Sequence, residues 1–145
     1  MRGLKLYFVI LVAVVVLVAS GCMGMGSKKL TCTQNTDGVD IEFNVGFSGN
    51  TIKSMDFSYD MDLSAYSDTQ IGMIENQDFC SIVKSSMSEY SNAFTDCKQN
   101  ISDKHLQVSA AFDVDKLTSS VLEKMTTPSA AKKDLEKQGY KCVIK

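Results

Sequence analysis

The stretch DGVDIEFNVGF, residues 37–47, decides the fold, because apolar residues occupy every odd position from Val39 to Phe47. Polar residues and one glycine occupy the even positions between them. This period of two predicts a β-strand with one buried face. Asp37-Gly38 before the strand and Gly49-Asn50 after it are hairpin-turn signals. Residues 29–36, 38–47 and 51–63 are therefore expected to form an antiparallel meander.

The period changes beyond residue 67, where apolar residues recur at spacings of three and four and predict a long helix over residues 68–93. A second hairpin is expected from strands 97–101 and 105–113. Asp115 is expected to cap a short helix through residue 125, and Pro128 to begin another that Gly139 ends. Residues 140–144 complete the pattern as a strand. The predicted fold is α+β: an antiparallel sheet of about six strands, in the order β-β-β-α-β-β-α-α-β, with helices packed on one face.

The N-terminus has the pattern of an export signal. Arg2 and Lys5 precede an apolar run over residues 6–19, which has the length of a signal-peptide core. The segment LVASGC, residues 17–22, then supplies small residues and a cysteine, as a bacterial lipoprotein cleavage site requires. We expect cleavage between Gly21 and Cys22 and acylation (palmitate) of Cys22. An uncleaved N-terminal membrane anchor is the alternative interpretation.

The predicted organisation is a lipoprotein signal peptide (residues 1–21), a lipidated tether (22–29) and a single α+β domain (30–145). The tether carries Lys28 and Lys29, which we expect to lie near anionic headgroups. The mature protein would be lipid-anchored to the cell membrane and face the extracytoplasmic side. Losing Arg2 and Lys5 reduces 15 basic residues to 13 against 17 acidic ones, a net charge of −4, so nucleic acid is not an expected partner.

Four further cysteines are available after Cys22 is assigned to lipid, and an even number in an exported domain predicts two disulfides. Three pairings are possible. Cys32 lies in the first predicted strand and Cys142 in the last, on the sides expected to face inward. We favour Cys32–Cys142, joining the two ends of the domain, and Cys80–Cys97, joining a helix to the following strand. No metal site is predicted, since the cysteines are not closely spaced and the chain has one histidine.

Several residues invite a functional interpretation that their context does not support. The acidic residues Asp56, Asp60, Asp62 and Asp68 do not form an EF-hand loop, because Ala65 and Ile71 stand where a glycine and a glutamate are needed. Alternation within a strand predicts a solvated acidic face instead, which could serve as an electrostatic contact surface.

His105 lies at a predicted turn without an acidic residue at helical spacing, so we expect a surface histidine rather than a general base. The spacings Ser81-x-x-Lys84 and Ser129-x-x-Lys132 lack the companion motifs of acyl-transfer enzymes. No catalytic residue and no cofactor are predicted.

Two further groups of residues are expected to be structural. The last helix is expected to present a basic, solvated face, while Ala131 and Leu135 form its buried side. The basic residues of that face are Lys132, Lys133 and Lys137. Five methionines are expected on mostly inward-facing positions, namely residues 55, 61, 73, 87 and 125.

Taken together, the pattern resembles the YehR-like small bacterial lipoproteins. The resemblance depends on the cleavage site at Cys22, the Lys29-Leu30-Thr31 strand, the alternating strand before Gly49-Asn50, the long helix, and the segments FDVD (112–115) and DLEKQGY (134–140). It implies an α+β lipoprotein and no catalytic residue. The four domain cysteines depart from the simplest members of that family.

We therefore expect a non-enzymatic, membrane-anchored domain that binds a small ligand or an envelope protein through the open face of its sheet or a groove between helix and sheet. An accessory or structural subunit of an envelope complex is the first alternative. An envelope enzyme with a dispersed site is the second.

Overall fold

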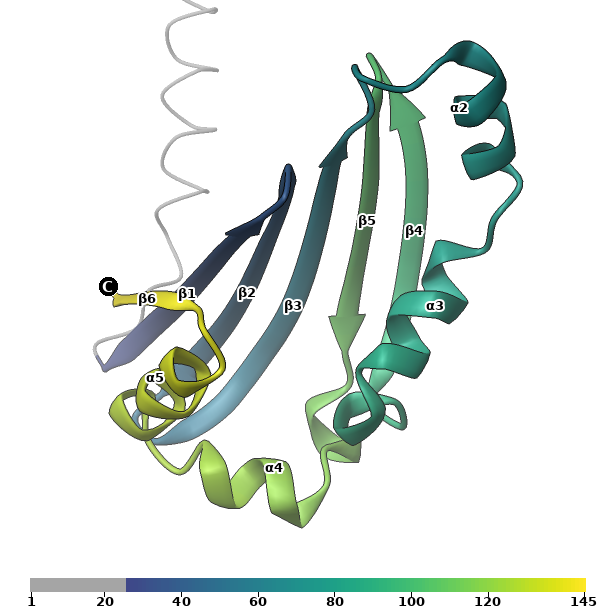
Figure 1. The fold of residues 1–145 in the computed structure, drawn as a ribbon. Coiled ribbons are helices and arrows are strands. Elements are labelled where there is room, and N and C mark those ends of the chain that lie inside the picture. The colour runs from purple at the N-terminus through teal and green to yellow at the C-terminus, as the bar shows by residue number, and fades with distance from the viewer. Residues whose placement is uncertain (1–25) are drawn as a thin grey trace, which may run out of the picture.

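The structure, a computed structural model, describes residues 26–145, which form an α+β domain (Figure 1). Its strands make one antiparallel sheet in the order β4-β5-β3-β2-β1-β6. The predicted fold class is confirmed. In chain order the elements are β1 (Ser27–Thr36), β2 (Val39–Ser48), β3 (Thr51–Asp62), α2 (Asp68–Glu75), α3 (Phe79–Ser86), the 3₁₀ turn η1 (Ser88–Tyr90), β4 (Phe94–Ser102), β5 (His105–Phe112), the 3₁₀ turn η2 (Val114–Lys116), α4 (Ser119–Lys124), α5 (Pro128–Lys137) and β6 (Lys141–Ile144).

The predicted meander is present as β1, β2 and β3. Thr36 pairs with Val39 across a two-residue turn. The turn residues Asp37 and Gly38 have φ of 52° and 81°. Two consecutive positive φ values match the right-handed twist of the flanking strands, and glycine adopts them without steric cost. Strand β1 begins at Ser27, so residues 27–29, expected to be tether, belong to the sheet.

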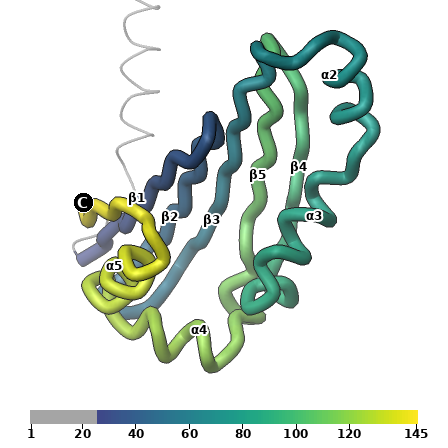
Figure 2. Tube along the Cα trace, viewed as in Figure 1, coloured from purple at the N-terminus to yellow at the C-terminus, as the bar shows by residue number. Residues whose placement is uncertain are grey.

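One face of the sheet is buried beneath the helices (Figure 2). Alternate side chains of the central strands enter this core, among them Phe43, Phe57 and Leu106, and the helices contribute Val83 from α3, Val121 from α4 and Ala131 and Leu135 from α5. Four aromatic rings pack edge-on or tilted with centroids 5.5–5.7 Å apart, those of Phe43, Tyr90, Phe94 and Phe112. The opposite face of the sheet carries the intervening polar residues.

The single long helix predicted over residues 68–93 is wrong, because the chain forms α2, α3 and η1 there. Helix α2 ends at Glu75 with Asn76 as its C-cap, and Asp78 caps the start of α3 by accepting a hydrogen bond from the Ser81 backbone N–H. Gln99 of β4 occupies the break: its Oε1 accepts from the Phe79 N–H at 2.8 Å, and its Nε2 donates to the Gln77 carbonyl at 2.9 Å. A side chain 20 residues away thus satisfies backbone groups that an unbroken helix would pair internally.

The start predicted for the next helix, at Asp115, is also wrong, because α4 begins only at Ser119. Asp113 caps the short turn η2, and Leu117 is then extended, with φ −64° and ψ 139°. Leu117 is buried in the core, and Thr118 caps α4 by accepting from the Val121 N–H. The core position of Leu117 divides the predicted helix in two.

The last helix agrees with its prediction. Pro128 opens α5, and Gly139, with φ 97°, follows its end. Ala131 and Leu135 are buried, as expected. Four of the five methionines expected on mostly inward-facing positions lie in or against the core, and Met73 on α2 is the exception, at 64% exposed.

Two disulfides join the pairs favoured from the sequence. Cys32 and Cys142 are register partners on β1 and β6, with Cα atoms 4.0 Å apart, and both are buried. Cys80 at the start of α3 bonds Cys97 of β4. The first bond attaches the four-residue strand β6 to the sheet, and the second fixes α3 against the opposite edge strand.

Candidate functional site

The face of the sheet without helices, called here the open face, presents polar side chains in cross-strand rows. Strand register places them side by side. One row contains Thr33, Glu42 and Ser58, and the next contains Asn35, Asp40, Asp60 and Gln107. The alternation that predicted a solvated acidic face is confirmed for Asp56, Asp60 and Asp62, while Asp68 lies apart in the first turn of α2.

A trough of about 500 Å³ hollows the open face. Strands β1, β2, β3 and β6, with Gly139 of the turn between α5 and β6, supply its lining. The polar side chains around it are Thr33, Gln34, Asn35, Asp40, Glu42, Ser58, Asp60 and Lys141. Three carboxylates against one ammonium group give the trough a net negative charge, which favours cationic ligand groups.

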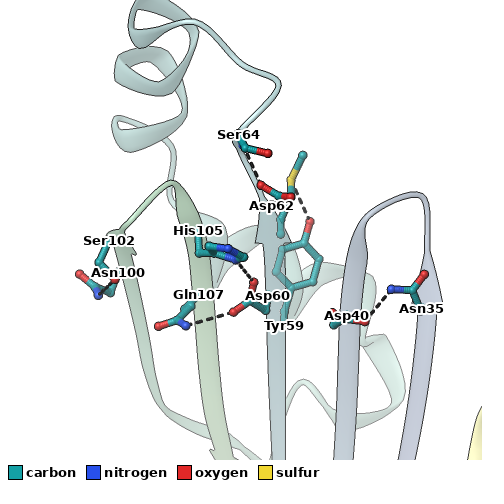
Figure 3. A network of polar contacts seen from close by, with 11 residues as sticks. Asn35, Asp40, Tyr59, Asp60, Asp62, Ser64, Asn100, Ser102, His105 and Gln107 are labelled. Carbon is teal, nitrogen blue, oxygen red and sulfur yellow. Dashed lines mark hydrogen bonds and ion pairs between the residues drawn. The ribbon is translucent and has the colours of Figure 1, made fainter.

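Asp40 and Asp60 are direct register partners in this trough. Like charges directly opposite each other on one sheet face destabilise the sheet. Neighbouring donors offset part of that repulsion: Asn35 Nδ2 donates to Asp40 Oδ1 at 2.6 Å, and Gln107 Nε2 donates to Asp60 Oδ2 at 3.0 Å (Figure 3). The Asp40–Asp60 pair is thus less favourable for the stability of the sheet than an uncharged pair would be, even with its amide donors. Residues that are unfavourable for local stability are typical of functional positions.

His105 is the second partner of Asp60. Its Nδ1 lies 2.6 Å from Asp60 Oδ1, and because a carboxylate only accepts, Nδ1 carries the proton (Figure 3). The hydrogen bond lowers the pKa of Asp60 and raises the pKa of His105. Both side chains are more than a third exposed. Within residues 26–145, no serine, threonine or cysteine side chain hydrogen-bonds His105, as the nucleophile of a hydrolytic triad would.

Asn44 lies in the row on the other side of Glu42 and is 6% exposed. Thr31 Oγ1 donates to Asn44 Oδ1 at 2.8 Å. Asn44 Nδ2 donates to Glu42 at 2.7 Å and to Asp56 at 3.0 Å. All of its strong side-chain hydrogen-bonding groups are used, so its amide has one orientation. Asn44 therefore fixes Glu42 at the border of the trough.

A smaller hollow of about 290 Å³ lies on the helix side, between η1 and the end of α5. Tyr90 and Tyr140 line it, and burial raises the pKa of Tyr90 to about 12. This is the groove between helix and sheet that the sequence offered as the second possible binding surface. It contains a single acidic group, Glu89, which pairs with Lys124.

The remaining predicted residues lie elsewhere. The signal segment, Gly21 and Cys22 precede the described residues, so cleavage and lipid attachment stay predictions. Lys132 of α5 pairs with Glu136 and donates to the Cys142 carbonyl, away from the trough. In residues 26–145, no helix combines the length and apolar character needed to cross a bilayer.

The sequence marks Asp60 as part of an acidic strand face and His105 as a surface histidine, but gives no sign that they are partners. They are 45 residues apart, and a direct β3–β5 pairing brings them together. In the sequence, Asn44 is only one of the polar positions of the alternating strand. Neither role has a local sequence signal.

By its fold, this protein belongs to the α+β class: helices cover one face of a six-stranded antiparallel sheet. That fold is YehR-like. It is similar to the NMR structure of the E. coli YehR protein, with a TM-score of 0.57 and 12% identity over 83% of this chain and 94% of that one.

An NMR structure of a protein from Streptococcus pneumoniae TIGR4 aligns with a TM-score of 0.42 and 17% identity, over 81% of this chain and 84% of that one. No protein-family model and no curated protein sequence matches this chain.

Proposed function

We propose that this protein is a non-enzymatic binding domain, tethered to the outer side of the cell membrane through lipid on Cys22, and that its open face binds an envelope partner. The trough on that face carries the proposal. Its paired carboxylates Asp40 and Asp60 would be relieved by an incoming ammonium or guanidinium group, so the partner segment presents Lys or Arg side chains.

The composition of the surface supports this choice over an apolar docking site. The large apolar residues exposed in the described part of the chain are Met73, Ile82, Leu122 and Val143. They lie on four different elements, α2, α3, α4 and β6, and so do not assemble into one strand or helix face. A concave polar surface is the arrangement expected of a binding domain.

The electrostatics also favour binding over catalysis. A general acid carboxylate needs a raised pKa, whereas the pKa values of Asp60 and Asp62 are lowered, the latter by hydrogen bonds from Ser64. If the protein is instead an accessory subunit of an envelope complex, it would use the same face. An accessory subunit is distinguished from a reversible binding domain because it stays bound to its partner at fixed stoichiometry through purification.

Site-specific photocrosslinking in intact cells tests the proposal. A photoreactive amino acid at Ser58, in the trough, should capture a defined envelope protein. The same group at Ser85, exposed on α3, is the matched control and should not capture it. The variant D40N/D60N should abolish capture at Ser58 without lowering the amount of protein. Capture that is absent at Ser58, or equal at both positions, would refute the open-face assignment.

The tether is tested separately. Cys22→Ser should abolish acyl labelling and block processing of the full chain. Normal processing of that variant would contradict the lipid attachment.

A further inference from the structure

Four exposed lysines gather at the end of the sheet where the described chain begins. They are called here the tether-end lysines: Lys28, Lys29, Lys53 and Lys145. The backbones of Lys29 and Lys145 exchange two hydrogen bonds of 2.9 Å, so β1 and the residue after β6 run side by side at this point. The chain termini of the domain thus bring together lysines 116 positions apart in the sequence.

An irregularity in β3 adds Lys53 to the same end. Gly46 pairs with Ser54 and Phe47 with Ile52, so Lys53 is an extra residue in the ladder. Ile52 and Met55 are both buried, and the two residues between them are exposed. The bulge therefore turns Lys53 to the open face, beside Ser54, which is level with Lys29 across the small residue Gly46.

The tether-end lysines lack anionic partners. Within residues 26–145 the ion pairs involve Lys116, Lys124, Lys132 and His105, and none of these four lysines. Their charge is available to an external anion.

The opposite end of the sheet carries more acidic than basic residues. Asp37 lies in the β1–β2 turn, Asp62 ends β3, and Asp103 lies in the β4–β5 turn. Asp40 and Asp60 stand nearby on the open face. Along β1, β2 and β3 the sheet therefore runs from the tether-end lysines to a mainly acidic end, whereas Asp115 of η2 lies near the β2–β3 turn and Lys104 lies beside Asp103.

The basic end is also the end nearest the expected lipid. The Gly26 carbonyl accepts a hydrogen bond from the Gly49 N–H at 3.0 Å, which holds the entering chain against the β2–β3 turn. Cys22 precedes Gly26 by four residues, and four residues span at most about 14 Å. Lipid on Cys22 would thus hold the headgroups at a distance from this end of the sheet that is comparable to the Debye length of about 8–10 Å. At that distance the charge of the headgroups is only partly screened from the tether-end lysines.

We propose that the tether-end lysines form a contact surface for the anionic headgroups of the bilayer that holds the lipid on Cys22. This contact sets the orientation of the domain. Asn35 at the trough lies six positions after Lys29 in β1, about 20 Å at 3.3 Å per residue. The acidic trough is held away from the anionic leaflet and open to a partner. The inference rests on the proposed tether at Cys22.

Lysine footprinting of the full-length, acylated protein on vesicles tests the inference. The protein is reconstituted on phosphatidylcholine vesicles or on vesicles with added phosphatidylglycerol, acetylated with an amine-reactive reagent, and analysed by mass spectrometry. The tether-end lysines should react at least about threefold more slowly on the anionic vesicles, since each lysine near such a surface is attracted to it. Lys84 on α3 and Lys104 in the β4–β5 turn are internal controls and should react equally on both.

A charge-reversal pair separates this surface from general charge. K53E/K145E should remove the protection of Lys28 and Lys29, while K84E/K104E, with the same change in net charge, should keep it. Equal reactivity on neutral and anionic vesicles, or loss of protection in K84E/K104E, would overturn the inference. Acyl labelling of Cys22 in the same sample distinguishes the failures: an acylated protein without protection contradicts the lysine surface alone, and an unacylated one contradicts the tether.

Discussion

Removal of the Cys32–Cys142 disulfide should destabilise the domain more than removal of Cys80–Cys97. The first bond joins residues 110 positions apart and the second joins residues 17 apart. In the chain-entropy model these separations correspond to about 5 and about 3 kcal/mol of the free energy of unfolding. Cys32 and Cys142 are also buried, so C32A/C142A loses packing in addition to the constraint.

The location of the first bond increases its effect. Lys29 and Lys145 form a hydrogen-bonded pair, and antiparallel pairs alternate, so Cys32 and Cys142 occupy a closely spaced pair without mutual backbone bonds. Strand β6 has four residues and lies at the edge of the sheet. Without the disulfide its attachment depends on a short ladder and on packing against α5.

Urea denaturation followed by circular dichroism measures the difference on the full-length chain in mild detergent. C32A/C142A should lose about 2 kcal/mol more than C80A/C97A. A domain of this size has about 5–15 kcal/mol of stability. A C32A/C142A variant that is unfolded without urea, beside a C80A/C97A variant that still shows a cooperative transition, gives the same ranking and also supports the reasoning. An equal loss in both variants, or a larger loss in C80A/C97A, would refute it.

Two further predictions follow from the open face. Asn44→Ala should lower the free energy of unfolding by about 1–3 kcal/mol in the same assay, because its partners lose buried hydrogen bonds; an unchanged midpoint would contradict this. An NMR titration of the single histidine should give His105 a pKa above 6.5 that falls in Asp60→Asn. Since the folded pKa of His105 is raised and that of Asp60 lowered, their contact stabilises the fold between about pH 3.8 and 6.5. That stability is lost as pH rises through the raised pKa of His105 or falls through the lowered pKa of Asp60, and a His105 titration unaffected by Asp60→Asn would exclude the contact.

Local patterns in the sequence determined the elements whose stability is itself local. The alternation over residues 37–47 specified β2 and its buried face, and Asp37-Gly38 specified the first turn. Pro128 and Gly139 bounded α5 through the fixed φ of proline and the freedom of glycine. Even the disulfide partners followed from which strands begin and end the domain.

Contacts between distant residues decided the rest. The break between α2 and α3 depends on Gln99, whose amide replaces helical hydrogen bonds from another strand. The pairing of β3 with β5 unites Asp60 with His105. The pairings of β1 with β6 and of β2 with β1 and β3 assemble the tether-end lysines. The alternation of apolar and polar residues in each strand can be seen in the sequence. The order of the strands in the sheet cannot, because it depends on the packing energy of the whole core. The polar trough and the basic end of this domain are consequences of that order.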